Sequence, residues 1–227
     1  VTNIYSETGE ALTIPLDRRL SIIQNMQAYY KKYDKLKRAQ KLLAVQQDAC
    51  RANIRHLESI EASLDSSTRL AEIAEIQEEL IASGYLHEKM PKKNKDRRAQ
   101  PFSFTAPDGM TILVGKNNMQ NDALTFRTAA PTDLWLHVRD IPGSHVILRT
   151  GGTAPSEETL HLAAQIAAHF SKARGSSTVP VDYTAIRFVK KPSGSVPGFV
   201  RFTHEKTLFV TEDEEALAPI LAQDPTV

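Results

Sequence analysis

Residues 133–146 read Asp-Leu-Trp-Leu-His-Val-Arg-Asp-Ile-Pro-Gly-Ser-His-Val, and they organise the second half of the chain. Aliphatic residues at 134, 136 and 138 alternate with Trp135, His137 and Arg139. This period of two predicts a strand with an aliphatic face and an aromatic, cationic face. Pro142 and Gly143 then favour a turn, so residues 145–148 should return as a second strand.

The aromatic and cationic face suits nucleic acid. An indole beside an imidazole and a guanidinium can stack on a base or hold a phosphate. Trp135, His137, Arg139 and, on the returning strand, His145 are therefore candidate RNA contacts. The alternative is that Trp135 is a core anchor and that Arg139 pairs with a neighbouring carboxylate, Asp133 or Asp140.

Composition limits the class of protein. The 227 residues suggest one or two domains, and a net charge of +1 gives no global attraction to nucleic acid. Cys50 is the only cysteine, which excludes an internal disulfide and fits a reducing cytosol. No apolar run reaches the length of a membrane span and no signal-peptide pattern opens the chain, so we expect a cytoplasmic location and no membrane partner.

The first part predicts a hairpin over residues 1–16, followed by a helix that Asp17 caps. From Arg18 to Leu64 there is neither glycine nor proline, and every seventh residue is apolar. The apolar series is Ile22, Tyr29, Leu36, Leu43, Cys50, Leu57 and Leu64. Such a sustained heptad predicts a coiled-coil arm roughly 70 Å long.

The seam of this arm needs a partner. The next predicted helix, 69–82, ends before Gly84 and is too short to cover it. We therefore expect either a first coiled-coil arm that precedes Val1 in a longer protein or a second copy of this chain.

Residues 89–100 form a predicted linker between an arm at 1–88 and a globular domain at 101–227. It carries six cations, among them Lys92 and Lys93, and Pro91 argues against a helix. The cations suit a phosphate-binding tether. A merely solvated linker is the alternative.

The amide-rich loop that follows Val114 is a further candidate RNA contact. Amides and a lysine can hydrogen-bond a base or a ribose, but the same residues also cap helices and make turns. The Walker spacing is absent. The candidates are Lys116, Asn117, Asn118, Gln120 and Asn121.

The remaining pattern predicts an α+β fold, in which the long helical arm is followed by a mixed α/β globular domain. Strands are expected at 102–105, 110–114, 186–189, 199–203 and 207–211, and helices at 123–129, 157–174 (capped by Ser156) and 212–223. Lys190 and Lys191 open a Lys-Lys-Pro-Ser-Gly loop that suits a phosphate backbone.

Enzyme chemistry is not indicated. The sequence has no metal-ligand cluster, no Gly-x-Ser-x-Gly elbow and no dinucleotide fingerprint. We therefore predict a protein that is not an enzyme and that needs no metal and no cofactor.

The chain resembles the C-terminal half of the NFACT family over nearly its whole length. The match rests on the runs 14–17 and 30–39 in the arm, 76–86 in the exit helix, and 114–122, 133–146, 179–184 and 190–194 in the RNA-binding NFACT-R module. Some family members carry the label of fibronectin- or fibrinogen-binding proteins.

The resemblance implies a cytosolic, ribosome-associated quality-control factor. The family protein binds large ribosomal subunits (rRNA) that carry an obstructed peptidyl-tRNA, recruits tRNA and supports untemplated alanine tailing of the stalled chain. The rival hypothesis is an adhesin with fibronectin as its partner. The absent signal peptide and the clustered cations favour the hypothesis of a ribosome-associated factor.

Overall fold

The computed structural model describes residues 1–87 and 99–224. The chain forms two compact units, residues 1–53 and residues 54–227. The second unit includes the C-terminal end of the long helix and the short helix after it. The sequence analysis divides the chain differently, into an arm at 1–88, a linker at 89–100 and a globular domain at 101–227. Those boundaries rest on composition and stay a prediction.

The first unit opens with a loop that is less regular than the predicted hairpin. A single antiparallel bridge joins Thr2 and Ala11. Helix α1 (Ile22–Asp65) begins after Ser21, whose backbone N–H and hydroxyl exchange hydrogen bonds with Gln24 at 2.8 and 3.2 Å. This capping box, not Asp17, starts the helix, which corrects the prediction by several residues.

Helix α1 confirms the long helix that the heptads predict, with 44 residues. The aliphatic and tyrosine positions of its seam are between 41% and 80% exposed. The seam therefore has an apolar surface that the described chain itself leaves uncovered, as the coiled-coil interpretation requires.

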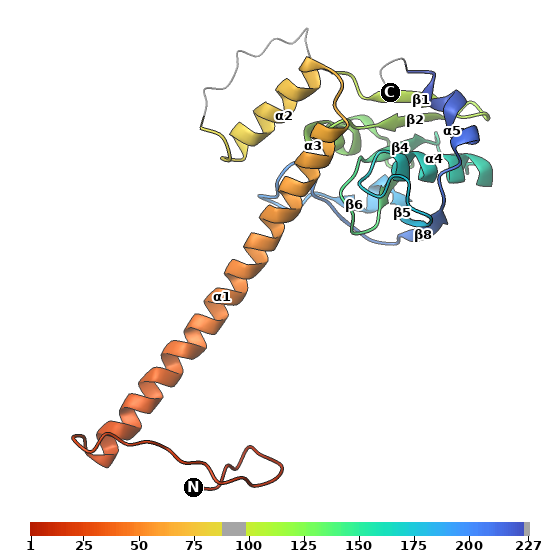
Figure 1. Cartoon of the computed structure of the whole chain (residues 1–227). Coiled ribbons are helices and arrows are strands. Elements are labelled where there is room, and N and C mark those ends of the chain that lie inside the picture. The colour runs from red at the N-terminus through yellow and green to blue at the C-terminus, as the bar shows by residue number, and fades with distance from the viewer. Residues whose placement is uncertain (88–98, 225–227) are drawn as a thin grey trace. The chain divides into compact units, whose positions relative to one another are not determined.

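The second unit is built on a six-stranded antiparallel sheet with the order β1-β2-β4-β3-β5-β8 (Figure 1). Its strands are β1 (Phe102–Thr105), β2 (Thr111–Val114), β3 (Leu134–Val138), β4 (Val146–Arg149), β5 (Val179–Ala185) and β8 (Lys206–Val210). The predicted 102–114 hairpin and the strand pair around the 139–145 turn are confirmed. The strand predicted at 186–189 is mostly a 3-10 turn, η3 (Ile186–Phe188).

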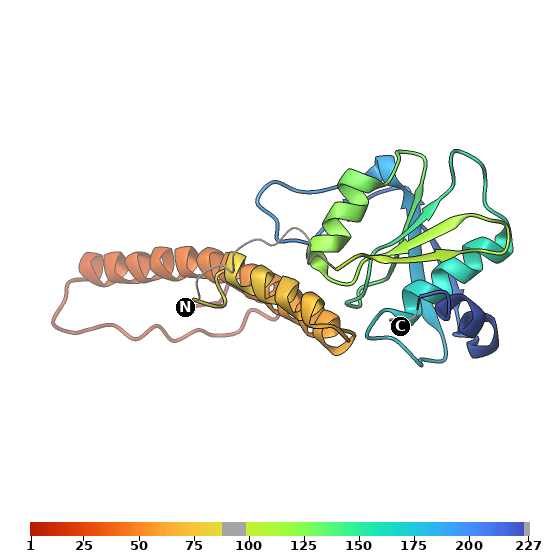
Figure 2. The ribbon, with the colours of Figure 1, turned by 90° about the horizontal axis from the view of Figure 1, so that it is seen from above.

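Each face of the sheet has its own core. Helix α4 (Glu157–His169) covers one face with Ala163, Ala164 and Ala167, and α5 (Glu214–Leu221) lies beside it (Figure 2). The other face is covered by α3 (Asn118–Ala123), η2 (Leu124–Thr128) and the small ribbon β6–β7 (Val189–Lys190 and Arg201–Phe202). The sheet therefore lies between two layers.

Two local predictions need correction. Ser156 caps α4 as expected, but the helix ends at His169 because Ser171 pairs with Gly143 in a backbone bridge. The predicted 199–211 hairpin does not form, because β7 pairs with β6 whereas β8 joins the main sheet.

Helix α2 (Leu70–Ala82) lies back alongside the C-terminal end of α1 (Figure 2). It begins one residue later than predicted and is followed by Gly84 at φ +79°, which suits a helix end. Over the described ranges 1–87 and 99–224, no helix has the length and apolar character needed to cross a bilayer.

Candidate nucleic-acid interface

The amide-rich loop is buried and holds its own backbone in place. Asn117 caps α3 and accepts the Gln120 N–H at 2.9 Å, and the Lys116 N–H donates to the Gln120 side chain at 3.1 Å. Asn121 accepts the backbone N–H of His145 at 3.0 Å, which ties the loop to the sheet. The capping alternative is thus confirmed for Asn117, whereas Gln120 and Asn121 accept backbone N–H groups of the loop and the sheet.

An acidic face of α2 binds the outer side of this loop. Glu72, Glu75 and Glu79 are spaced by three and four residues, so they share one face of the helix. The Lys116 ammonium lies 2.9 Å from the Glu72 carboxylate, and Asn118 donates to Glu79 at 2.9 Å. Glu75 accepts side-chain hydrogen bonds at 2.6 and 2.9 Å from Asn117 and Gln120.

The end of α1 completes this polar joint. His56 lies 2.9 Å from Glu79, and Ser59 donates to Asn118 at 2.8 Å. Burial alone would raise the pKa of Glu72, but hydrogen bonds from Lys116 and from the backbone of residues 68 and 69 hold that pKa below its ordinary value. The paired carboxylate therefore stays charged in the interior.

All five candidate residues of the amide loop, Lys116, Asn117, Asn118, Gln120 and Asn121, are buried. As folded they cannot reach RNA directly, because their polar groups face the acidic helix or the sheet. The sequence did carry a signal for this joint, namely three glutamates on one face of α2. That signal was missed because their partners lie some forty residues further along the chain.

Trp135 is also interior. Its side chain is 1% exposed and packs with Ile147, Ile186 and Val189. Its ring stacks on His137, with 5.6 Å between the ring centroids. The core-anchor alternative is confirmed, and no face of the indole is open to a base in this structure. Among the described residues, its Nε1 has no hydrogen-bond partner.

The two histidines of this region are neutral. Burial lowers the pKa of His137, and burial followed by the proximity of His137 lowers the pKa of His145 to about 3. The ring of His145 is hydrogen-bonded to Thr125 at 2.9 Å. Neither imidazole therefore offers a positive charge to a phosphate at neutral pH.

Arg139 forms an ion pair with a partner that the sequence did not indicate. Its guanidinium donates two hydrogen bonds to Asp182 on the neighbouring strand, at 3.0 and 2.6 Å, and neither Asp133 nor Asp140 is its partner. This pairing raises the pKa of Arg139. The side chain is still 42% exposed, so it lies at the surface with its charge largely compensated.

Two of the predicted cations, Lys190 and Lys191, are on or beside the β6–β7 ribbon. Lys190 is exposed and lies directly across from Arg201, while Lys191 pairs with Asp122. The neighbouring register pair, Val189 and Phe202, faces the second core. Because side chains alternate along strands, Lys190 and Arg201 point away from that core into solvent. The predicted Lys92 and Lys93 lie outside the described residues.

Sequence reasoning missed the cations that accompany Lys190. Arg187 is exposed in η3, which connects β5 to β6, and Lys206 is exposed at the start of β8, which follows β7. We call Arg187, Lys190, Arg201 and Lys206 the basic ribbon. Like charges placed directly across a strand pair destabilise it. The Lys190–Arg201 pair therefore costs stability and gives a local site for an anion.

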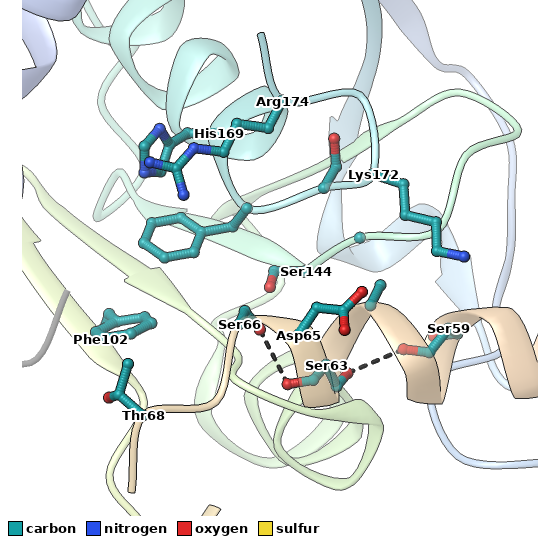
Figure 3. Close-up of a pocket in the computed structure, with 14 residues that line it drawn as sticks. Ser59, Ser63, Asp65, Ser66, Thr68, Phe102, Ser144, His169, Lys172 and Arg174 are labelled. Carbon is teal, nitrogen blue, oxygen red and sulfur yellow. Dashed lines mark hydrogen bonds between the residues drawn. The ribbon is translucent and has the colours of Figure 1, made fainter.

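A separate groove of about 440 Å³ lies between the end of α1 and the turn after α4 (Figure 3). Three of its hydroxyls donate to backbone carbonyls: Ser63 to residue 59, Ser66 to residue 63 and Ser171 to residue 168. Lys172 at its rim pairs with Glu61. With these donors engaged, the groove is a weaker phosphate site than the basic ribbon.

No group of three or more His, Cys, Asp or Glu side chains within 1–87 and 99–224 is arranged to hold a metal ion.

Comparison with known proteins places both parts of the chain in one family. Residues 1–99 match the family model described as NFACT N-terminal and middle domains, and residues 100–202 match the model described as NFACT protein RNA binding domain. A solved structure of the C-terminal region of the fibronectin/fibrinogen-binding protein from Streptococcus suis is 45% identical. It superposes with a TM-score of 0.78 over 89% of this chain and 81% of that one.

Curated relatives agree. The proteins named Rqc2 homolog RqcH from Bacillus subtilis and Streptococcus suis are 44% and 47% identical over 96% and 92% of this chain. The chain spans 38% of the length of either relative. The match of both family models and the high identity of relatives across nearly all of its length show that the chain belongs to the NFACT family.

Proposed function

We propose that this chain is part of a ribosome-associated quality-control factor, in which the domain that contains residues 100–202 binds RNA of the large ribosomal subunit through the basic ribbon. The relatives named RqcH and the RNA-binding family model support the proposal. In the complete protein, this contact would help to hold the factor on large subunits that carry an obstructed peptidyl-tRNA during alanine tailing. The chain would bind and position RNA and tRNA without a catalytic step of its own, in the cytoplasm.

The observation that carries the proposal is the outward-facing pair Lys190 and Arg201, held in register on a short ribbon. A fold gains nothing from two like charges directly opposite each other. Phosphates supply the missing counter-charge, and lysine and arginine are their usual ligands in protein–RNA contacts. The same ribbon rests on a buried core, so the two cations are presented on a firm base.

The arm makes a second contribution to this proposal. Its exposed seam from Ile22 to Leu64 would pair with another helix, either the first arm of a longer protein or a second copy of the chain. The paired rod would then offer a second contact to the subunit.

Binding of the chain to purified large ribosomal subunits across a salt series tests the RNA contact. The test variant is Lys190→Gln/Arg201→Gln, which removes both charges and keeps polar side chains of similar length. Arg174→Gln is the matched control, because Arg174 follows α4 on the opposite face of the sheet. The proposal requires weaker binding for the double variant and unchanged binding for the control. Equal binding of all three proteins would contradict it.

The rival function is binding of fibronectin, which the name of the solved streptococcal relative attributes to that protein. A protein–protein contact of that kind would depend less steeply on salt than a phosphate contact. If immobilised fibronectin binds the wild type and the double variant equally, whereas large subunits bind neither, the rival is favoured.

A further inference from the structure

A stack of three side chains lies at one end of the β6–β7 ribbon. The guanidinium carbon of Arg187 lies 4.9 Å from the ring centroid of Phe188. The imidazole of His204 stacks on the same phenyl ring, with 4.3 Å between centroids and 25° between planes. Phe188 is partly buried, whereas His204 is exposed. Phe188 packs on one face of the imidazole, and the exposed surface of His204 is what remains for a further contact.

The backbone holds His204 in an unusual conformation to make this stack. Its φ is +59°, in the left-handed region that residues other than glycine rarely adopt. The neighbouring carbonyl of Thr203 accepts a hydrogen bond from the Thr184 hydroxyl at 2.9 Å, which fixes the loop to β5. The Thr203 hydroxyl in turn lies 3.0 Å from Nδ1 of His204 and orients the ring. Backbone strain that surrounding hydrogen bonds maintain occurs most often at functional sites.

The charges around the stack match one class of ligand. Phe188 immediately precedes β6 and His204 closely follows β7, so the stack lies at the Val189–Phe202 end of the β6–β7 ribbon, one register pair away from the outward-facing Lys190 and Arg201. Glu205 is an exposed carboxylate next to the stack, and its charge acts on Arg139. A flat ring with cations beside it suits a nucleotide whose base is unstacked and whose phosphates reach the ribbon.

We infer that the exposed surface of His204 is a stacking platform for an unpaired RNA base, which would extend the Arg187–Phe188–His204 stack by one ring. This inference rests on the proposed function, because the ribbon must bind the adjoining phosphates. The inference adds to the proposed function the requirement that the RNA partner offers an unpaired base, in a loop, a bulge or a single strand. A continuous duplex keeps its bases stacked on one another and could engage only the ribbon.

Two RNA probes of equal length separate the stacking contact from the phosphate contact. One is an oligoadenosine, and the other is an abasic RNA with the same number of phosphates. The wild-type chain should prefer the oligoadenosine by about fivefold to a hundredfold, the range expected for one stacked base. Fluorescence anisotropy at one fixed salt concentration measures both affinities.

The main variant is His204→Asn, since asparagine tolerates a positive φ and lacks the ring. It should abolish the preference for oligoadenosine and leave the affinity for abasic RNA unchanged. Phe188→Leu, which removes the supporting ring and keeps an apolar side chain, should reduce the preference. His87→Asn is the matched control, because His87 is exposed in the connection after α2.

The outcomes separate the two claims. Abasic RNA that binds as tightly as oligoadenosine, or a preference that survives His204→Asn, overturns the stacking inference and leaves the phosphate contact standing. Failure of the wild type to bind either probe overturns both claims. Thermal unfolding of each variant shows whether a loss of preference accompanies a loss of fold.

Discussion

The buried pair of Lys116 and Glu72 gives the sharpest test of how the amide loop works. Both side chains are almost fully buried, and the ammonium lies 2.9 Å from the carboxylate. The substitution Lys116→Met keeps the aliphatic stem and removes the charge. It leaves Glu72 in the interior without its cation, a change that typically costs about 3–5 kcal/mol of folding free energy.

That cost should be visible as a lower melting temperature. For a domain of this size, about 1 kcal/mol corresponds to roughly 2–4 °C, so Lys116→Met should melt roughly 6–20 °C below the wild type. Addition of Glu72→Gln should recover most of the loss. Glutamine is neutral, and its carbonyl oxygen can still accept the N–H groups of residues 68 and 69 that Glu72 now caps.

Circular dichroism melts of the wild type, the two single variants and the double variant form a double-mutant cycle that measures this coupling. RNA affinity, measured below the melting transition, should be the same for all four proteins. If Lys116→Met has the melting temperature of the wild type and binds RNA more weakly, Lys116 is an RNA ligand. The account of a buried Lys116–Glu72 pair is then refuted.

Three further predictions concern the core, the loop and the arm. Because burial lowers the pKa of His145 from 6.5 to about 3, the unfolded chain binds more protons below pH 6.5. Stability should therefore fall by about 2 kcal/mol between neutral pH and pH 5, and His145→Gln should flatten this dependence in urea titrations. Gly115→Ala should lower the melting temperature in scanning calorimetry, because its Cβ would lie 2.2 Å from the Asn121 side chain and 3.0 Å from its backbone nitrogen. If two copies of the chain pair through the α1 seam, light scattering should show self-association as the concentration rises, and a strict monomer with intact helicity would contradict pairing between two copies.

The fold was largely accessible from sequence where local patterns are strong. The heptads predict α1, and the alternation around Trp135 predicts β3, because each pattern depends only on the spacing of apolar residues along one element. Strand β5 was missed because Pro180 interrupts an otherwise suitable run, and proline argues against a central strand. The strand nevertheless pairs on both sides, with β3 and β8.

The candidate site was predictable only in part. Lys190 could be predicted from sequence because the Lys-Lys-Pro-Ser-Gly pattern is local, and Lys190 is exposed in the structure. Its partner Arg201 could not be found from sequence, since the two residues meet only because β6 pairs with β7 across ten intervening residues. The amide loop was misleading for a physical reason: amides that bind RNA and amides that cap a helix or bind carboxylates have the same composition.

The salt dependence of binding to purified large ribosomal subunits tests the central claim most directly. Each lost phosphate contact should reduce the slope of log K against log salt by about 0.7–0.9. Lys190→Gln/Arg201→Gln should therefore bind with a slope shallower by about 1.4–1.8 than the wild type, while Arg174→Gln keeps the wild-type slope. Identical slopes for the wild type and the double variant would contradict the assignment of the RNA contact to the basic ribbon.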